Sequence, residues 1–141
     1  MRFWDASAVV PMLCSQASTA AALRLRDEDP RVVTWAWTPV ECVSALRRLS
    51  RGGVLTETEV WSAVRRMDQL RDVWTEVLDV EAVRRRAERC LHVHPLRAAD
   101  AGQLAAALVV GDQLGRALPF VTFDGRLAEA ARREGLEVLG I

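Results

Sequence analysis

Hydrophobic residues along the chain change their spacing repeatedly, from short continuous runs to a helical period. Three short runs, 2–4, 31–35 and 120–123, are rich in aromatic or β-branched residues and predict strands. Segments 73–80 and 136–141 are plausible further strands. The runs at 2–4 and 120–123 are apolar on both faces, so we expect them at the centre of a parallel sheet.

Helical patterns fill the intervals between these strands. The expected helices follow Asp5 and Asp124 and cover 18–27, 81–90 and 98–116. Pro11 must lie in the first turns of its helix or kink it. Strands that alternate with helices predict an α/β fold with a central parallel sheet of about five strands covered by helices. A length of 141 residues fits a single domain, 1–141.

Two more helices carry start signals of their own. Thr38 and Pro39 have the types expected at an N-cap and a first helical position, and Glu41 stands at the capping-box site. Thr56 and Glu59 repeat the capping box, and the helix that follows is expected to run to about residue 71. Glu41 therefore has a sufficient structural explanation as a capping residue.

Composition and charge then limit the chemistry. Nineteen basic residues, all arginine, balance nineteen acidic ones, so any nucleic-acid contact must be local. Mechanisms that need a lysine are excluded. The cysteines Cys14, Cys42 and Cys90 form no C-x-x-C pair, which indicates neither a disulfide framework nor a zinc site. We expect a cytoplasmic protein with no membrane span, because the N-terminal region carries an acid where a secretion signal needs apolar residues.

Two aspartates directly follow the predicted central strands. Asp5 and Asp124 each lie at the carboxyl end of such a strand, where open α/β sheets bind their ligands. An acid at this position also caps the next helix, which is worth roughly 1 kcal/mol. For either residue alone, capping and ligand binding are equally good interpretations.

Asp100 is harder to explain as a surface residue. Leu104, Leu108 and Gly111 follow it at helical spacing, so its carboxylate continues the apolar stripe of a nearly all-apolar helix. An inward carboxylate needs a partner, and a metal ion is an obvious candidate because the chain has no lysine. Together with Glu41, the chain then has four carboxylates able to flank one crevice.

Four carboxylates at one end of a sheet repel one another unless a cation is present. Oxygen ligands without a cysteine or histidine cluster suit Mg²⁺ or Mn²⁺. His92 and His94 are interpreted as helix-end or loop residues and not as ligands. The sequence thus indicates a site for a hard divalent cation.

Four segments resemble, in order and spacing, the acidic motifs of PIN-domain nucleases, specifically the VapC toxins of toxin–antitoxin modules. They are FWDASAVVPML, TPVECVSALRRL, PLRAADAGQLAAAL and FVTFDGRLAEAAR. The resemblance implies a PIN-like fold and a Mg²⁺- or Mn²⁺-dependent ribonuclease. By motif, the catalytic and metal-binding acids would be Asp5, Glu41, Asp100 and Asp124. Ser7 and Thr122 would be hydroxyl groups that hold a carboxylate or a water molecule.

The resemblance also implies products with a 5′-phosphate and a 3′-hydroxyl, a cognate VapB-type antitoxin and a homodimer. RNA phosphates are expected to be held by arginines near the acids: Arg47, Arg48, Arg51 and Arg97. The alternative for these arginines is a solvated helix face. The helix pair 38–71 is the expected surface for the antitoxin and for a second copy, since amphipathic helices need a covered apolar face.

Other protein classes place acids at strand ends too. A phosphoacceptor receiver domain requires a lysine after a late strand, and this chain has none. A haloacid-dehalogenase-like phosphatase requires a second aspartate where Ser7 stands. The remaining alternative is a catalytically silent PIN-fold binding protein, against which the presence of all four acids argues.

Overall fold

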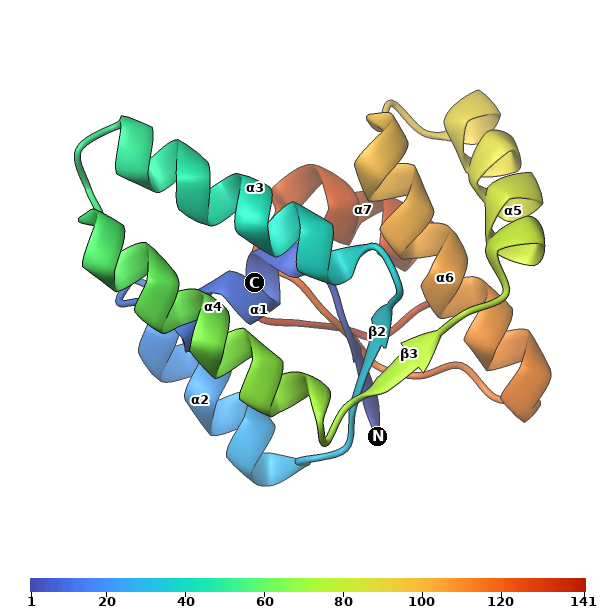
Figure 1. Cartoon of the computed structure of the whole chain (residues 1–141). Helices are drawn as coiled ribbons and strands as arrows, with labels where there is room; N and C mark the ends of the chain where they lie inside the picture. Colours follow the sequence, from blue (N-terminus) through green and yellow to red (C-terminus); the bar gives the residue numbers. More distant parts are fainter.

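A five-stranded parallel sheet with strand order β3-β2-β1-β4-β5 forms the centre of the molecule (Figure 1). The computed structural model describes the whole chain, residues 1–141. Its strands are β1 (Arg2–Trp4), β2 (Val32–Trp35), β3 (Thr75–Val77), β4 (Phe120–Val121) and β5 (Val138–Leu139). The predicted fold class is confirmed, and β1 and β4 are neighbours at the centre of the sheet, as expected from their apolar faces.

Seven helices connect these strands, and none of them combines the length and the apolar character that crossing a membrane requires. They are α1 (Ala6–Leu13), α2 (Thr19–Glu28), α3 (Thr38–Arg51), α4 (Glu57–Arg71), α5 (Val80–Val93), α6 (Ala98–Leu114) and α7 (Gly125–Arg133). Pro11 lies inside α1, which ends two residues later. The predicted helices are confirmed, although α5 extends three residues further than the expected 81–90.

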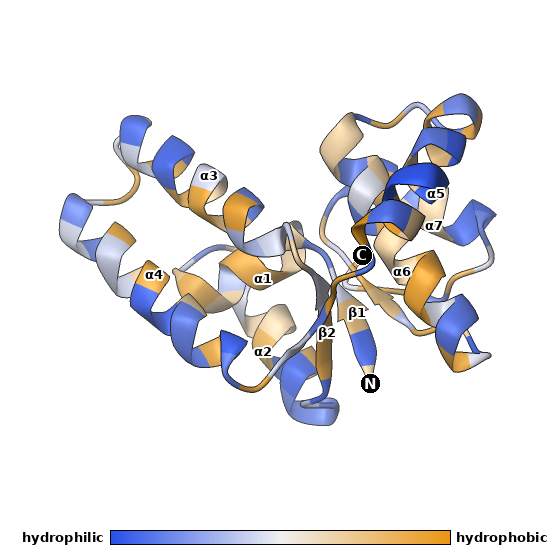
Figure 2. Ribbon diagram, turned by 45° about the vertical axis from the view of Figure 1, so that its right-hand side comes forward, coloured by the Kyte–Doolittle hydropathy of each residue, from blue (hydrophilic) through white to orange (hydrophobic).

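Alternate residues of each central strand enter two separate cores, one on each face of the sheet. Phe3 and Phe120 stack, with ring centroids 5.5 Å apart, in the core under α5, α6 and α7. Trp4 and Val121 point the other way, into the core under α1 to α4. Figure 2 shows these two groups of helices on opposite sides of the strands. The carboxyl ends of β1 and β4 therefore open between two helical layers.

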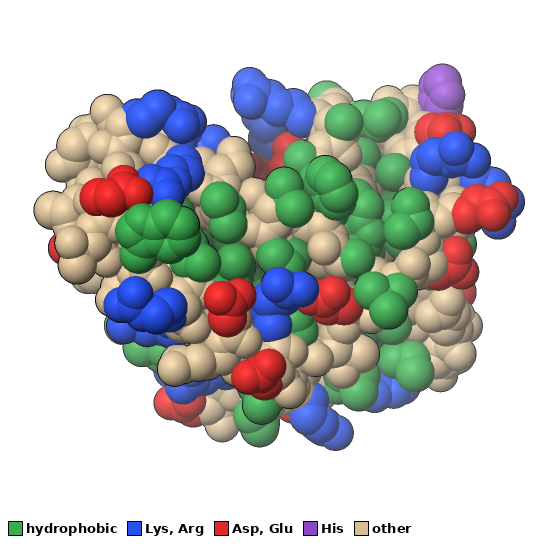
Figure 3. All heavy atoms as spheres, viewed as in Figure 1, with side chains coloured by type: hydrophobic (Ala, Val, Ile, Leu, Met, Phe, Trp, Pro, Cys, Tyr) green, Lys and Arg blue, Asp and Glu red, His purple; other side chains and the backbone are tan.

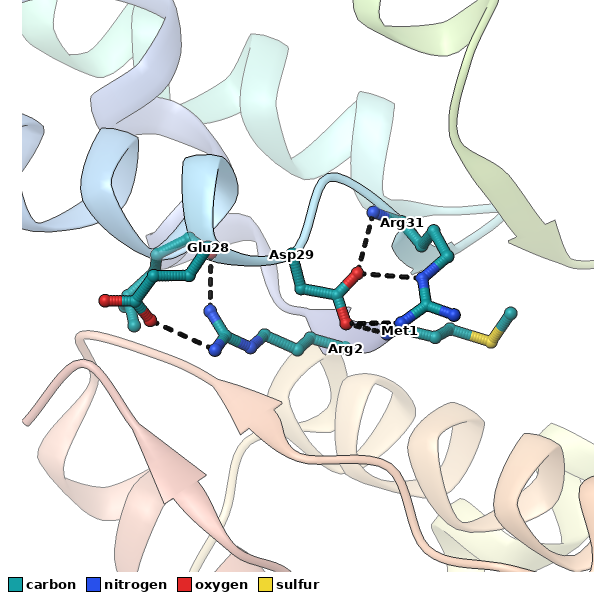
Figure 4. Close-up of polar contacts among 6 residues, drawn as sticks. Met1, Arg2, Glu28, Asp29 and Arg31 are labelled. Carbon is teal, nitrogen blue, oxygen red and sulfur yellow. Dashed lines mark hydrogen bonds and ion pairs between the residues drawn. The ribbon is translucent and has the colours of Figure 1, made fainter.

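Ion pairs tie the opposite, amino-terminal end of the sheet together (Figure 4). The Met1 amine and the Arg31 guanidinium both bind the Asp29 carboxylate, and Arg2 binds Glu28. These contacts link the start of β1 to the α2–β2 connection. They lie at the end of the sheet opposite to the carboxyl ends of the strands.

The two predicted capping boxes have different outcomes. Thr56 and Glu59 form a complete capping box at the start of α4, as predicted. The capping box predicted for Thr38 and Glu41 is wrong: Thr38 is already within α3, and no side chain caps the N-terminus of this helix. The Thr38 hydroxyl instead accepts a hydrogen bond from the Trp35 backbone N–H and contacts Gln103 of α6. A long-range contact has replaced the local one, which frees Glu41 for another role.

Candidate active site

A cavity of about 860 Å³ lies at the carboxyl ends of the central strands, between α3, α6 and α7. All four acids expected from the sequence line it: Asp5, Glu41, Asp100 and Asp124. Figure 3 shows acidic side chains between α3 and α6 at the top of the view, partly hidden beneath a basic side chain. The fold thus brings together four carboxylates that are spread over 120 positions of the sequence.

Asp5 is the most deeply placed of these carboxylates, with 4% of its surface exposed. The backbone N–H and the hydroxyl of Ser7 both donate to it, at 3.0 and 2.8 Å. The Ser7 oxygen in turn accepts from the Phe123 backbone N–H at 2.8 Å. Since the hydroxyl hydrogen of Ser7 points to Asp5, the Thr122 hydroxyl, 3.2 Å away, must donate to Ser7. Both hydroxyls therefore lie where they can hold Asp5 in place.

Asp124 caps α7 and faces the cavity as well. Its Oδ1 accepts from the Leu127 backbone N–H at 2.8 Å, so the capping interpretation of this residue is confirmed. Its own backbone N–H donates to the Thr122 hydroxyl at 3.0 Å. One carboxylate oxygen is used by the cap, and the residue also lines the cavity, so the two interpretations of Asp124 do not exclude each other.

Glu41 is half-buried on the first turn of α3 and is held by a residue of α6. Gln103 Nε2 donates to Glu41 Oε1 at 2.9 Å. Asp100, three residues before Gln103, is half-buried in the first turn of α6 and lines the same cavity. Asp100 therefore lies at the cavity, while Leu104 and Leu108, which follow it at helical spacing, are buried.

Burial raises the pKa of three of these acids. Asp5 reaches a pKa of about 6, although the hydrogen bonds from the Ser7 backbone and hydroxyl act in the opposite direction. Burial raises the pKa of Glu41 to about 7, and repulsion from Asp5 and Asp100 adds to the effect. Burial, followed by the neighbouring Asp124 carboxylate, also raises the pKa of Asp100. The cavity thus concentrates negative charge that the protein itself only partly compensates.

Three arginines line the same cavity: Arg48 of α3, Arg97 before α6 and Arg126 of α7. Two of them, Arg48 and Arg97, were expected from the sequence. Arg47 instead binds both oxygens of Glu57 at 2.8 Å, with its guanidinium 5.4 Å from the Trp61 ring, and Arg51 is exposed outside the cavity. The three arginines that line the cavity are all solvent-exposed and can bind an anionic ligand.

The donor set fits a hard divalent cation by its chemistry. The cavity lining contains five carboxylates, the fifth being Glu129, and no cysteine or histidine. No three His, Cys, Asp or Glu side chains are grouped closely enough in this structure to form a ready-made metal site. Asp5 and Glu41 nevertheless have uncharged side chains as their hydrogen-bond donors, Ser7 and Gln103.

Two residues that belong to this site, Gln103 and Arg126, are not predicted from the sequence. Gln103 is the single uncharged polar residue within the apolar stretch after Asp100, which is the signal that could have identified it. Arg126 follows Asp124 by two positions and gave no separate signal. His94 lies at the end of α5, as expected for a helix-end residue; it is buried outside the cavity lining and contacts Glu134 at 2.7 Å.

The chain is similar to known proteins along nearly its whole length. Residues 2–133 match the family described as PIN domain. Ribonuclease VapC45 of Mycobacterium tuberculosis (strain CDC 1551 / Oshkosh) is 32% identical to this chain over 139 residues, covering 96% of this chain and 92% of VapC45.

Solved structures support the fold independently. Mycobacterium tuberculosis VapC20, described as a sarcin–ricin loop cleaving toxin, superposes with a TM-score of 0.65 at 20% identity, over 92% of this chain and 95% of VapC20. FitAcB from Neisseria gonorrhoeae gives a TM-score of 0.65 at 18% identity, over 99% of this chain and 96% of that one. The five-stranded sheet and its helical layers are therefore those of a recurrent fold.

Proposed function

The chain belongs to the PIN-domain family, with VapC ribonucleases among its relatives, and on this premise we propose that it is a metal-dependent endoribonuclease acting as a toxin. One observation carries the proposal: acids from four separate segments line a single cavity together with three arginines. This combination suits a polyanionic substrate whose phosphodiester bond is hydrolysed with the help of a cation.

Asp5, Glu41, Asp100 and Asp124 are the residues that would hold Mg²⁺ or Mn²⁺. When bound, such an ion would activate water for attack on phosphorus and neutralise charge on the phosphoryl and leaving oxygens. The hydroxyls of Ser7 and Thr122 keep Asp5 in place through bonds to the backbone beyond β4. Hydrolysis breaks the bond between phosphorus and the 3′ oxygen, which leaves a 5′-phosphate and a 3′-hydroxyl.

Arginine side chains provide the contacts to RNA in this proposal. Arg48, Arg97 and Arg126 approach the cavity from three different elements, so they can bind phosphates on either side of the scissile bond. Arg51, one turn beyond Arg48 on α3, can contact RNA that extends out of the cavity. Arg47 is less suited to this role, because Glu57 already occupies its guanidinium group.

A toxin of this kind requires a cognate antitoxin, and we propose the α3–α4 pair as its docking surface and as the surface for a second copy. Large apolar side chains of this pair and of the turns at its ends remain about half exposed or more: Trp37, Val40, Val54 and Trp61. Co-purification with the product of a neighbouring gene, and the mass of the isolated protein in solution, test these two assemblies. We also propose a cytoplasmic location, which the proposed RNA substrate and the three free, buried cysteines support.

RNA cleavage by the purified, antitoxin-free protein tests the proposed function. We expect cleavage in Mg²⁺ or Mn²⁺, loss of cleavage in EDTA, and loss of at least 100-fold in activity for Asp5→Asn. Asp68→Asn, an exposed substitution on α4, is the matched control and should cleave like the wild type. Intact RNA under every metal condition would instead identify a silent PIN-fold binding protein.

A further inference from the structure

Gln103 is a buried amide within an otherwise apolar part of α6. Only 1% of its surface is exposed, and Leu104 to Val109 follow it without a polar side chain. Burying an amide without hydrogen bonds is unfavourable by roughly 1–3 kcal/mol, so its partners in the structure matter. Its Nε2 donates to Glu41 Oε1 at 2.9 Å and to the Thr38 hydroxyl at 3.1 Å. Both partners belong to the first turn of α3.

The direction of this amide is set by the Glu41 carboxylate, which in its ionised form can only accept hydrogen bonds. The Trp35 N–H, at the end of β2, donates to the Thr38 hydroxyl oxygen at 3.2 Å. The hydroxyl hydrogen of Thr38 therefore remains available to donate to Gln103 Oε1, 3.4 Å away. A reversed amide would turn Oε1 toward the Glu41 carboxylate and place two acceptors against each other. The hydrogen-bonding pattern thus directs the NH₂ group toward Glu41.

Close packing between α6 and the end of β2 makes this contact possible. At Gly102, next to Gln103, an added Cβ would lie 2.5 Å from Cζ3 of the Trp35 ring. No side chain larger than hydrogen fits there without moving the tryptophan or the helix. The absence of a side chain at Gly102 therefore permits the approach that brings Gln103 to Thr38 and Glu41.

Asp5 and Glu41 are held in corresponding ways, through backbone N–H groups at the ends of the two strands that flank β1. A backbone N–H beyond β4 binds Ser7, which donates to Asp5. A backbone N–H at the end of β2 donates to the Thr38 hydroxyl, which also contacts the Gln103 amide, and Gln103 donates to Glu41. The contact from Gln103 engages Oε1 only, so the second oxygen of Glu41 can face the cavity that the residue lines.

We propose that Gln103 is a positioning residue: its amide fixes the Glu41 carboxylate so that the remaining oxygen is oriented for a divalent cation in the cavity. This inference rests on the proposed function, because it assigns Glu41 to metal binding. Partners that orient a metal ligand typically change metal affinity 10- to 100-fold when removed. Gln103 acts through Glu41 and does not touch the substrate.

Mn²⁺ binding to the purified protein, measured by titration calorimetry or electron paramagnetic resonance, tests the inference without RNA. Gln103→Met keeps the length and helical preference of the side chain and removes the amide. We expect its dissociation constant for Mn²⁺ to rise about tenfold or more, with its metal-free melting temperature within a few degrees of the wild type. Gln113→Met, an exposed glutamine on the same helix, is the control and should bind like the wild type.

A second pair of variants separates positioning from packing. In a Glu41→Gln background, Gln103→Met should cause no further loss of Mn²⁺ affinity, because the carboxylate through which it acts is gone. Thr38→Ser, which keeps the hydroxyl that Gln103 contacts, should bind Mn²⁺ like the wild type, whereas Thr38→Val removes this contact and should weaken binding. An equal loss from Gln103→Met in both backgrounds would overturn the inference.

The outcomes for the two proposals differ. A wild-type protein that binds Mn²⁺ and cleaves RNA, together with an unchanged Mn²⁺ affinity in Gln103→Met, would overturn the positioning role alone. A wild-type protein that binds no Mn²⁺ would overturn the metal-dependent function and the positioning role with it.

Discussion

Replacing Asp5 by asparagine should stabilise the metal-free protein at neutral and alkaline pH. Asp5 is almost fully buried, and burial is the main cause that raises its pKa from 3.8 to about 6. Asparagine has nearly the same shape and carries no charge to desolvate. The backbone N–H of Ser7 can still donate to the amide oxygen, while the bond from the Ser7 hydroxyl to the second oxygen is lost.

The expected magnitude follows from these two changes. A pKa raised by about two units corresponds to roughly 3 kcal/mol of unfavourable free energy once the carboxyl is ionised. The lost hydrogen bond offsets about 1 kcal/mol of this. The net stabilisation above the folded pKa is then about 2 kcal/mol, which for a chain of this length raises the melting temperature by roughly 5–8 °C.

The pH dependence gives the prediction its sign. Because the folded pKa of Asp5 lies above the unfolded value, the unfolded chain binds fewer protons between pH 4 and 6, and wild-type stability falls as pH rises through this range. The stability of Asp5→Asn should not fall in this pH range, because asparagine does not titrate. Its advantage should therefore be absent at pH 4 and fully developed above pH 7.

Thermal or urea denaturation in EDTA, at a series of pH values from 4 to 8, measures this difference. Asp68→Asn, exposed on α4, is the control and should follow the wild type at every pH. The reasoning is refuted if Asp5→Asn is no more stable than the wild type at pH 8, or if its advantage is the same at pH 4.

Three further predictions follow from the same structure. Asp124→Asn should keep the hydrogen bond from the Leu127 N–H, so its free energy of unfolding should lie within about 1 kcal/mol of the wild type. The variant should nevertheless lose RNA cleavage. If a turnover assay shows that cleavage is retained, Asp124 has only its capping role. Millimolar Mg²⁺ should raise the melting temperature of the wild type by several degrees, because a ligand that binds only the folded state stabilises it. The melting temperature of Asp5→Asn should rise much less. Equal shifts of the two proteins in scanning calorimetry would show that Asp5 does not share in binding a cation. Gly102→Ala should destabilise the protein by about 1–3 kcal/mol in urea denaturation, since its Cβ would overlap the Trp35 ring; an unchanged midpoint would show that α6 can move without strain.

The elements of the fold could be predicted because their signals are local. Runs such as 2–4 and 120–123 are apolar on both faces, and β1 and β4 are indeed the central neighbours of the sheet. The same reasoning placed Asp5 and Asp124 correctly, because a residue that follows a central parallel strand must lie at the carboxyl edge of the sheet. The position of Asp100 followed from helical spacing alone.

The parts that could not be predicted depend on neighbours that are distant in sequence. Glu41 was expected in a capping box with Thr38. The Thr38 hydroxyl is hydrogen-bonded to Trp35 and Gln103 instead. Glu41 accepts a hydrogen bond from Gln103, which is 62 positions away in the sequence. Which arginines of α3 line the cavity also depends on contacts that are distant in sequence. Arg47 and Arg48 differ by one position, and only the location of Glu57 on α4 determines that Arg47 is paired while Arg48 lines the cavity.

Anomalous diffraction from crystals soaked in Mn²⁺ tests the central claim most directly. The proposed function predicts an anomalous peak in the cavity, coordinated by carboxylate oxygens from the set Asp5, Glu41, Asp100 and Asp124. The peak should weaken or disappear in crystals of Asp5→Asn. A protein that cleaves RNA while its crystals show Mn²⁺ only away from these carboxylates, or none at all, would contradict the account.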